Sequence, residues 1–434
     1  MLATDWVKMD NHLHLKTNMS KLISVESINN AAKRLEGVVK KTPLQFNKRL
    51  SKLFEANIYI KREDLQEVRS YKIRGAYNLM SSLSVEERKR GVVSASAGNH
   101  AQGVAFAASS LKIKAIIFMP VITPLQKINK VKQFGGRWVE IKLVGQTFDE
   151  SSQESKKLSK EKNMAYVHPF DDLRTIIGQG TVGKEISEQL EKGADILIAP
   201  VGGGGLISGV GTYMRSTYPK IEIIGVEPKG APSMYESINK GKVVTLDKIN
   251  TFVDGAAVKT VGQKTFEISK EFIKKIILVD EGNVCTTMIE LYQNEGIIAE
   301  PAGALTIAAL DQLKEKIKNK TVVCILSGGN NDILRYPEIM EKSLVYQGLK
   351  HYFLVEFAQK PGQLKNFLNY CLGPSDDIVL FEYTKKNSRE RGPALIGIEL
   401  SKKEDLMALL KNMNKYEIKF TKINSDDPLY SFVL

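Results

Sequence analysis

A lysine at the expected start of a helix is the first residue that could do chemistry. Lys72 lies in the segment Ser70–Asn78, just after a strand expected at Ile58–Ile60. Burial and the helix dipole both lower the pKa of an amine in this position, so the amine could act as a nucleophile or form an imine. A single lysine at a helix start is nevertheless far more often a solvated surface residue. Lys72 alone therefore leaves both interpretations open.

A second segment, Ser94–Gly103, combines small residues with a side-chain amide. It follows a strand expected at Val92–Ser94 and opens a helix that extends to Ser110. Small residues let a ligand approach the backbone, and the free amides at a helix start bind an anion such as a carboxylate. Asn99 adds an amide that could contact a phenolic oxygen. The alternative is an ordinary helix start with Ser96 or Asn99 as its N-cap.

Four consecutive glycines, Gly202–Gly205, follow a strand expected at Ile196–Pro200. Such a run costs chain entropy and has little use as a simple turn. Its backbone amides, with a helix start behind them, form a concave site suited to a phosphate. The segment lacks the Lys-Ser/Thr pair of a Walker A loop and the G-x-G-x-x-G spacing of a dinucleotide fold. It therefore indicates the phosphate of a cofactor that needs no magnesium-bound triphosphate.

The fourth segment, Ser327–Asn330, follows a strand expected at Thr321–Leu326. Ser327 could cap the next helix, or its hydroxyl could lie near a ring nitrogen. A lysine, a phosphate site, a carboxylate site and such a hydroxyl are together the components of a pyridoxal-phosphate site. The four segments in combination favour this cofactor, although none of them does so alone.

The elements that position these segments alternate along the chain. An amphipathic helix is expected at Val25–Val39, and from Ile58 to about Ser327 short β-branched runs alternate with helical periodicity. Further strands are expected at Ala115–Met119 and Ile221–Val226. Their apolar runs without polar alternation predict parallel strands buried on both faces, with a ligand crevice at the carboxyl ends. The pattern predicts an α/β protein in which the sheet brings the segments together.

The order of expected helices and strands changes beyond Arg335–Gly348. The order strand, helix, strand, strand, helix, strand predicts a compact four-stranded sheet with two helices on one face. The expected elements are His351–Phe357, Pro361–Tyr370, Ile378–Tyr383, Leu395–Leu400, Glu404–Met413 and Ile418–Ile423. We therefore expect an N-terminal extension at 1–24, a catalytic domain at 25–345 with a smaller subdomain at about 88–180, and a separate domain at 350–434.

Length and composition limit the classes of protein. The 434 residues are 43% hydrophobic and 26% charged, as in a globular protein of two or three domains. The net charge of +13 comes from basic residues interleaved with acids, which favours a solvated surface over nucleic-acid binding. The three cysteines form neither a disulfide framework nor a zinc spacing. No apolar run is long enough for a membrane span or a signal peptide, so we expect a cytoplasmic protein.

Six segments of the chain occur in the order seen in one enzyme family. They are Ser70–Ala76, Ser96–His100, Gly202–Leu206, Gly225–Pro228, Ala299–Ala304 and Ser327–Asn330. Over nearly its whole length the chain resembles the threonine dehydratases, which are fold-type II pyridoxal-phosphate enzymes. The resemblance implies a tryptophan synthase beta-like catalytic part with two open twisted sheets and a single ACT-like α+β domain at the C-terminus.

The resemblance also implies roles for individual residues. Lys72 would form the Schiff base with pyridoxal 5'-phosphate and remove the Cα proton of the substrate. Asn99 would bond the cofactor O3′, and Ser327 would face its pyridine nitrogen. The main chain that would hold the phosphate comprises Gly202, Gly203, Gly204, Gly205 and Leu206. The residues that would line the substrate carboxylate site are Ser96, Gly98, Asn99 and His100.

The same resemblance implies a reaction and its regulation. L-Threonine would lose water and then ammonia to give 2-oxobutanoate, the first step of isoleucine biosynthesis. Isoleucine would inhibit by binding the C-terminal domain, where the turn Gln359–Leu364 offers helix-start amides. A purely structural dimerisation sheet is the alternative for this domain. A homotetramer or homodimer is expected.

A cation site and three alternative functions stay open at this point. Related enzymes hold a metal near a Glu-Pro segment through that Glu, a main-chain oxygen and an acid. The corresponding positions here are Glu227, Ala231 and Ser233, so only a weaker monovalent cation at Glu227 is expected.

A catabolic serine/threonine dehydratase or a serine racemase would share all four segments but would generally lack the C-terminal domain. A non-catalytic protein that senses amino acids would need neither Lys72 nor Ser327.

Overall fold

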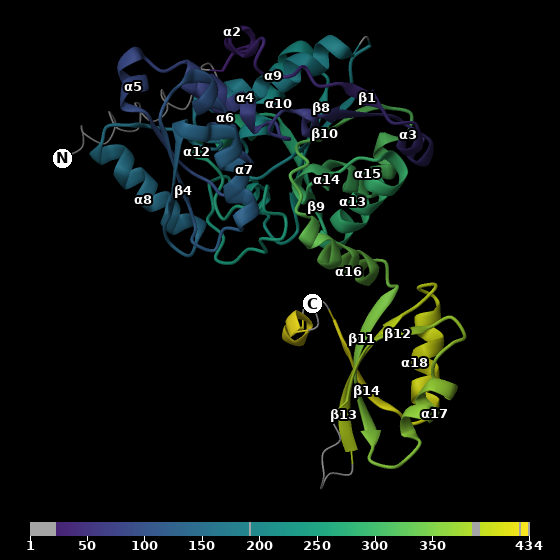
Figure 1. Cartoon of the computed structure of the whole chain (residues 1–434). Helices are drawn as coiled ribbons and strands as arrows, with labels where there is room; N and C mark the ends of the chain where they lie inside the picture. Colours follow the sequence, from purple (N-terminus) through teal and green to yellow (C-terminus); the bar gives the residue numbers. More distant parts are fainter. Residues whose placement is uncertain (1–22, 191, 384–390, 425–426, 433–434) are drawn as a thin grey trace, which may run out of the picture. The chain divides into compact units, whose positions relative to one another are not determined.

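The chain forms two compact units (Figure 1). The computed structural model describes residues 23–190, 192–383, 391–424 and 427–432. The first unit comprises Met1–Glu281 and Leu291–Asn331, and the second comprises Gly282–Glu290 and Asp332–Leu434. We refer to them as the catalytic unit and the regulatory unit, after the two domains that the sequence leads us to expect.

The division between the units differs from the one expected at residues 345–350. Helix α16 (Tyr336–Tyr346) packs against the first strand of the regulatory unit, so it groups with that unit rather than with the preceding sheet. The segment Gly282–Glu290 also groups there, which no local pattern indicates. The expected N-terminal extension at 1–24 lies almost wholly outside the described residues.

The larger sheet of the catalytic unit has the strand order β1-β2-β10-β7-β8-β9. Its strands are β1 (Leu44–Phe46), β2 (Asn57–Arg62), β7 (Ile196–Pro200), β8 (Glu222–Pro228), β9 (Ile273–Val279) and β10 (Thr321–Leu326). All neighbours are parallel except the β1–β2 pair. Every residue of β7 is buried, as expected for a central strand covered on both faces.

The smaller sheet is wholly parallel, with the order β5-β4-β3-β6. Its strands are β3 (Val92–Ala95), β4 (Ala115–Met119), β5 (Val139–Leu143) and β6 (Ala165–Tyr166). The two open sheets confirm the predicted α/β fold of the catalytic part. The strands expected at Ala115–Met119, Ile196–Pro200 and Thr321–Leu326 have the bounds that the sequence predicts.

Helices surround both sheets (Figure 1). Around the larger sheet and between the sheets lie α2 (Val25–Leu35), α3 (Lys48–Phe54), α4 (Lys72–Ser81), α9 (Leu173–Gln189), α10 (Gly205–Thr217), α11 (Ser233–Lys240), α12 (Gln263–Ser269), α14 (Pro301–Ala308) and α15 (Leu310–Ile317). Helix α13 (Glu281–Glu295) contains the segment Gly282–Glu290 that groups with the regulatory unit. The smaller sheet is accompanied by α5 (Val85–Arg90), α6 (Asn99–Leu111), α7 (Leu125–Gly135) and α8 (Phe148–Glu161). Helix α4 packs against both α6 and α9, so it joins the two parts of the catalytic unit.

The first helix is shorter than its apolar pattern predicts. Helix α2 begins with a capping box in which the Ser24 hydroxyl accepts from the Ser27 amide. It ends at Leu35 rather than at Val39. Gly37 has a φ of +75°, a left-handed conformation that stops the helix before the apolar pattern ends.

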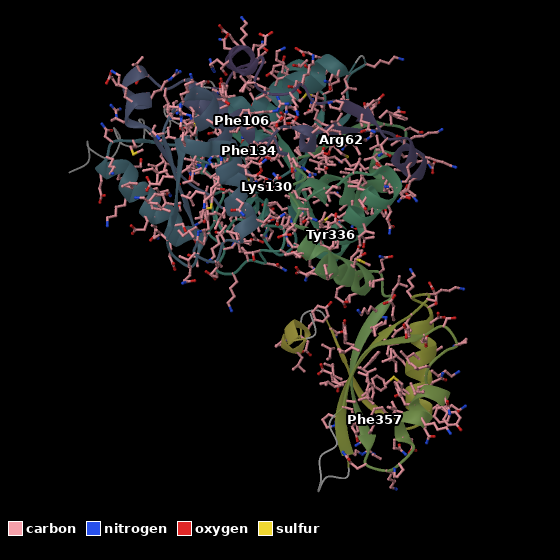
Figure 2. The ribbon with its side chains drawn as sticks, viewed as in Figure 1. Arg62, Phe106, Lys130, Phe134, Tyr336 and Phe357 are labelled. Atoms are coloured by element: carbon pink, nitrogen blue, oxygen red, sulfur yellow. The ribbon has the colours of Figure 1, made fainter. Side chains whose placement is uncertain are left out.

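The regulatory unit contains an antiparallel sheet with the order β12-β13-β11-β14. Its elements are α16, β11 (Lys350–Ala358), α17 (Gln363–Tyr370), β12 (Asp377–Tyr383), β13 (Arg391–Glu399), α18 (Asp405–Lys415), β14 (Lys419–Ile423) and η5 (Pro428–Phe432). One face packs on α17 and α18, where Phe357 meets Phe367 with ring centroids 5.6 Å apart (Figure 2). The predicted βαββαβ order is confirmed.

Candidate active site

Lys72 is the first residue of α4, as the sequence predicts. Its Nζ donates to the Pro169 carbonyl oxygen at 3.0 Å, and the side chain keeps some access to solvent. Burial lowers the pKa of the Lys72 amine to about 8, against an opposing effect of the Glu300 charge. A substantial fraction of this amine is therefore neutral and nucleophilic near neutral pH.

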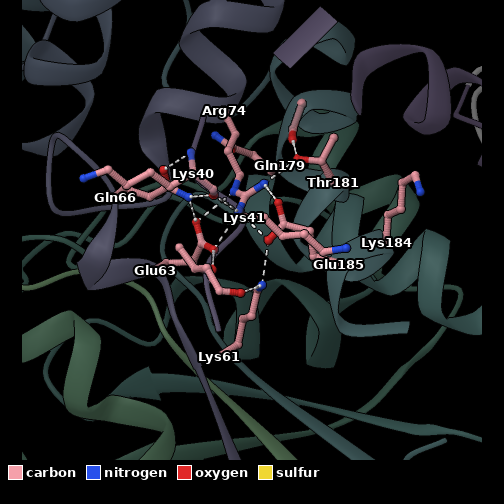
Figure 3. A network of polar contacts seen from close by, with 12 residues as sticks. Lys40, Lys41, Lys61, Glu63, Gln66, Arg74, Gln179, Thr181, Lys184 and Glu185 are labelled. Atoms are coloured by element: carbon pink, nitrogen blue, oxygen red, sulfur yellow. Dashed lines mark hydrogen bonds and ion pairs between the residues drawn. The ribbon is translucent and has the colours of Figure 1, made fainter. Parts of the chain in front are cut away.

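A buried ionic cluster holds helix α4 in place (Figure 3). The Arg74 guanidinium, 1% exposed, donates to both oxygens of Glu63 at 2.8 Å. It also donates to both oxygens of Glu185 at 2.7 and 2.9 Å, and Lys61 Nζ reaches Glu185 at 2.6 Å. Two positive and two negative groups thus balance one another. Because Arg74 lies two residues after Lys72, the cluster positions the first turn of α4.

The glycine-rich turn forms a cradle of unused amides. Within the part of the chain that the structure describes, no protein group accepts a hydrogen bond from the amides of Gly203–Leu206. Gly204 has a φ of +90°, and a Cβ on Gly203 would lie 2.3 Å from the Phe170 ring. Free amides at the start of α10 attract an anion, so the cradle fits a phosphate group.

The loop that follows β6 joins this cradle to Lys72. Pro169 accepts from Lys72, and the adjacent Phe170 ring packs on the glycines. Asp171 accepts from the amides of Lys264 and Thr265 at 2.8 and 3.2 Å, and the Thr265 hydroxyl donates to the Gly203 oxygen at 2.6 Å. The sequence interpretation missed this loop because its preceding strand has only two residues and shows no periodicity.

Ser327 lies beside the backbone that precedes Lys72. The Tyr71 amide donates to the Ser327 carbonyl oxygen at 3.1 Å, and Ser70 forms a bridge with Gly328. The Ser327 hydroxyl donates to the Ala302 oxygen at 3.3 Å and caps no helix, so the capping alternative is wrong. Ser70 Oγ is buried with no partner among the described residues, which leaves a polar atom for a ligand.

Four polar side chains connect the two parts of the catalytic unit. Asn99 Nδ2 donates to Glu300 Oε1 at 2.7 Å, and Asn330 Nδ2 donates to Asn99 Oδ1 at 2.8 Å. Lys130 of α7, labelled in Figure 2, donates to Asn330 Oδ1 at 3.2 Å. Burial, with a smaller effect from Asp254, raises the pKa of the Glu300 carboxyl to about 7. The sequence pointed to Asn99, but it did not predict that Asn330 orients it.

The loop before α6 is a helix start without a side-chain cap. Gly98 is the N-cap residue, and its own amide donates to Ser96 Oγ at 3.2 Å, so neither Ser96 nor Asn99 caps the helix. His100 is buried, and its Nε2 donates to the Val167 oxygen at 2.9 Å. Burial and the Lys72 charge lower the pKa of His100 to about 3, so the ring is neutral. Contact of these residues with a substrate carboxylate stays a prediction.

Glu227 caps a helix in the structure. Its two carboxylate oxygens accept from the amides of Met234 and Tyr235 at 2.8 Å each, and burial raises its pKa to about 8. Among the residues that the structure describes, no group of three or more His, Cys, Asp or Glu side chains could hold a metal ion. The expected cation at Glu227 stays a prediction that this geometry does not support.

Comparison with known families defines the class of protein. The model for the pyridoxal-phosphate dependent enzymes matches residues 35–328, which include Lys72, the glycine-rich turn and Ser327. Fold and site together are those of a pyridoxal-phosphate-dependent enzyme. A second model, the C-terminal regulatory domain of threonine dehydratase, matches residues 341–433.

Individual relatives narrow the assignment. The chain is 52% identical over 412 residues to a biosynthetic L-threonine dehydratase of Halalkalibacterium halodurans, covering 95% of this chain and 99% of the relative. Its counterpart in Bacillus subtilis is 50% identical, covering 95% and 98% of the two chains. The structure of threonine deaminase isoform 2 from Solanum lycopersicum superposes with a TM-score of 0.69 at 42% identity, covering 74% of this chain and 94% of that one. The chain belongs to the threonine dehydratase family.

Maize serine racemase has a similar fold. Its structure superposes with a TM-score of 0.69 at 33% identity, covering 75% of this chain and 98% of the racemase. Among the described residues, no helix is both long and apolar enough to cross a bilayer.

Proposed function

We propose that the protein converts L-threonine to 2-oxobutanoate and ammonia. The observation that carries the proposal is that the Lys72 amine and the amide cradle Gly203–Leu206 meet the same loop, at Pro169 and Phe170. A reactive amine and a phosphate site are thereby held at a fixed separation. The two relatives of 50% and 52% identity, both named as biosynthetic L-threonine dehydratases, support threonine as the substrate.

The residues of the site fit pyridoxal phosphate. Lys72 would hold it covalently, the free amides of Gly203–Leu206 would bind its phosphate, and Asn99 would contact its O3′. The Ser327 hydroxyl would meet the ring nitrogen as a neutral partner. When bound, the cofactor supplies an electron sink that stabilises negative charge at Cα.

The protein's own groups would then handle the substrate and its protons. The amides at the start of α6 would orient the threonine carboxylate. The Lys72 Nζ would take the Cα proton, because its lowered pKa leaves part of it unprotonated at neutral pH. Loss of the β-hydroxyl with a proton balances the elimination of water, and hydrolysis then releases ammonia.

Replacing Lys72 tests this assignment directly. The K72A variant should lose the visible absorbance of lysine-bound cofactor, and threonine turnover should fall by at least about a hundredfold. Lys89→Ala, on the exposed helix α5, is the matched control and should keep both signals. Persistent threonine deamination by purified K72A would refute the role of Lys72.

We also propose that isoleucine inhibits the enzyme through the regulatory unit, as the first step of isoleucine biosynthesis requires. The start of α17, where Gly362 has a φ of +85°, offers backbone amides to an effector carboxylate. A homotetramer or homodimer in the cytoplasm is the expected form. Assays of 2-oxobutanoate from threonine, with and without isoleucine, test the regulation, and light scattering tests the oligomeric state. If isoleucine changes neither the rate nor the shape of the curve of rate against threonine concentration, the proposed inhibition is contradicted.

A racemase or serine dehydratase is the second candidate, because the maize serine racemase shares the catalytic fold. The regulatory unit and the biosynthetic relatives favour the threonine reaction. Incubation with L-serine, followed by separate measurement of pyruvate and D-serine, distinguishes the candidates. Faster formation of D-serine than of 2-oxobutanoate from threonine would favour the racemase.

A further inference from the structure

The regulatory unit contains a cavity of about 480 Å³ that no role described so far uses. It lies among the end of α16, the start of β11, the end of β14, α18 and η5. The residues that line it are Val345, Tyr346, Gln347, Gly348, Lys350, His351, Tyr352, Lys403, Leu406, Lys422, Ile423, Asn424 and Tyr430. Three of them are lysines and one is a histidine, whereas none is an aspartate or glutamate.

Among the residues that the structure describes, only one of these lysines has a carboxylate partner. Lys350 Nζ lies 2.5 Å from Glu341, which also accepts from the Tyr352 hydroxyl at 2.6 Å. Lys422 is partly buried and has no carboxylate partner in the described part of the chain. Burial lowers the pKa of the Lys422 amine, because removing the ammonium group from water disfavours its charged form.

His351 adds a second basic group beside Lys422. It is 7% exposed, and its Nε2 donates to the Gly348 oxygen at 2.9 Å. Burial lowers the pKa of His351, and the Lys422 charge lowers it further, so the protonated forms of these two groups repel one another. A bound anion would offset the desolvation and the repulsion together.

Part of the remaining wall is apolar, and Gln347 and Asn424 add polar side chains to it. Val345, Leu406 and Ile423 contribute aliphatic surface, and Tyr352 and Tyr430 pack their rings 6.1 Å apart. A ligand that fits both features has a carboxylate for the lysine and a short aliphatic body for the walls. No carboxylate is among the lining residues, and the nearby Glu341 is already paired with Lys350, so an ammonium group gains less here than a carboxylate does.

We propose that this cavity binds a short aliphatic carboxylate without an ammonium group, held by Lys422. The 2-oxo acids belong to this class, and so does the product if the proposed function is correct. The site is separate from the α17 turn assigned to an amino-acid effector.

Calorimetric titration of the full-length holoenzyme tests the proposal. Butanoate and 2-oxobutanoate are the carboxylate probes, with L-isoleucine and inorganic phosphate as comparisons. We expect binding of both carboxylates at about 1 mM or tighter. Lys422→Gln should weaken that binding at least tenfold, while Lys422→Arg should keep it within a factor of three. Lys411→Gln, an exposed position on α18 outside the cavity, should change nothing.

Measurement of the melting temperature shows whether K422Q is folded, so that lost binding is not mistaken for unfolding. The K422Q variant removes an uncompensated charge, so its melting temperature without ligand should equal or exceed that of the wild type. Equal carboxylate binding by K422Q and wild type would overturn the proposal, as would absent binding to the wild type. Tighter binding of phosphate than of butanoate, or isoleucine binding that K422Q abolishes, would also overturn it. Calorimetry measures binding and not turnover. Failure of the proposed threonine reaction would therefore appear only in the 2-oxobutanoate assay, and failure of this proposal only in the titration.

Discussion

Burial sets the charge states of two residues in the candidate active site. Lys72 and Glu300 lie within one unit, and burial shifts their pKa values in opposite directions, toward about 8 and about 7. Each shift disfavours the charged form of its group, as desolvation requires. The two groups can therefore exchange protons with a substrate near neutral pH, where an ordinary lysine and glutamate have fixed charges.

The Glu300 carboxyl makes stability depend on pH in a specific direction. Its pKa in the folded protein, about 7, lies above the ordinary value of 4.5, so the folded state binds the extra proton between these values. Wild-type stability should therefore fall as the pH rises from about 4.5 to about 7, and the full cost is present above pH 7. In Glu300→Gln this dependence disappears, and the variant should gain on the order of 3 kcal/mol relative to wild type across that range.

Thermal unfolding of the cofactor-free proteins at pH 5 and pH 8 measures this effect. The variant also loses the hydrogen bond from the Asn330 amide, which lowers its melting temperature equally at both pH values. This effect therefore cancels when the two pH values are compared. A difference in melting temperature between variant and wild type that is the same at pH 5 and pH 8 would contradict the assignment.

Helix starts and turns decide where the reactive groups lie. The start of α4 presents Lys72, the start of α10 presents free amides, and the start of α6 presents Gly98 and Asn99. Each helix follows a strand whose carboxyl end lies at the same edge of its sheet, which is where α/β proteins bind ligands. Tight packing behind the turns keeps these amides free for a ligand.

The amide cradle should bind a phosphate less tightly when a side chain is added to Gly203. In Gly203→Ala the new Cβ would lie 2.3 Å from the Phe170 ring, so either the ring or the turn must move. We expect the affinity for pyridoxal phosphate to fall at least tenfold, measured by absorbance during titration of the cofactor-free protein. The double variant Gly203→Ala/Phe170→Ala should recover part of the loss, whereas no recovery would show that the ring is not the obstacle.

The buried cluster around Arg74 should matter far more than an exposed ion pair. Arg74→Met leaves Glu63 without its main partner, and we expect a loss of about 3–5 kcal/mol in the free energy of unfolding of the catalytic unit. The exposed pair between Lys89 and Glu86, each more than two-thirds exposed, is the matched control. Lys89→Met should cost about 1 kcal/mol or less.

A double variant separates the charge from the packing in this cluster. Arg74→Met/Glu63→Gln removes one positive and one negative group, so the second change should cost less than it does alone. Denaturant titration of the catalytic unit measures each step. Strictly additive costs would show that Arg74 and Glu63 act independently, against the 2.8 Å contacts between them.

At the scale of the whole molecule, each unit has its own hydrophobic core. The catalytic unit buries residues such as Ile198 and Val210, and the regulatory unit buries Phe353, Phe367 and Met413. Units with separate cores unfold as separate cooperative blocks when few contacts stabilise both. All proposed cofactor contacts belong to the catalytic unit alone.

Removal of the cofactor should therefore affect one unfolding transition. Differential scanning calorimetry of the holoenzyme should show two transitions, and only one should fall in temperature after the cofactor is stripped. A ligand present at 100 times its dissociation constant stabilises by about 2.7 kcal/mol, which is a shift of several degrees. Equal shifts in both transitions would show that the cofactor stabilises the regulatory unit as well.

Much of the fold was predictable from local patterns. Apolar runs without alternation predicted the buried strands β4, β7 and β10 at their observed bounds, because a strand covered on both faces needs no polar residues. The glycine run and the small residues before α6 indicated ligand contact, because a backbone can approach a ligand only where side chains are absent. The shorter α2 shows the limit of periodicity, since the φ of Gly37 ends it.

The sequence by itself therefore determined the class of fold, the order of the segments and the residue types of the site. Only the tertiary structure decided that Asn330 orients Asn99, that Phe170 packs under the glycines and that Glu227 caps a helix. It also decided which acids surround Arg74. The physical reason is that these contacts join residues far apart in the chain, and burial then sets their charge states. Neither these contacts nor the burial of these polar groups leaves a periodic signal along the sequence.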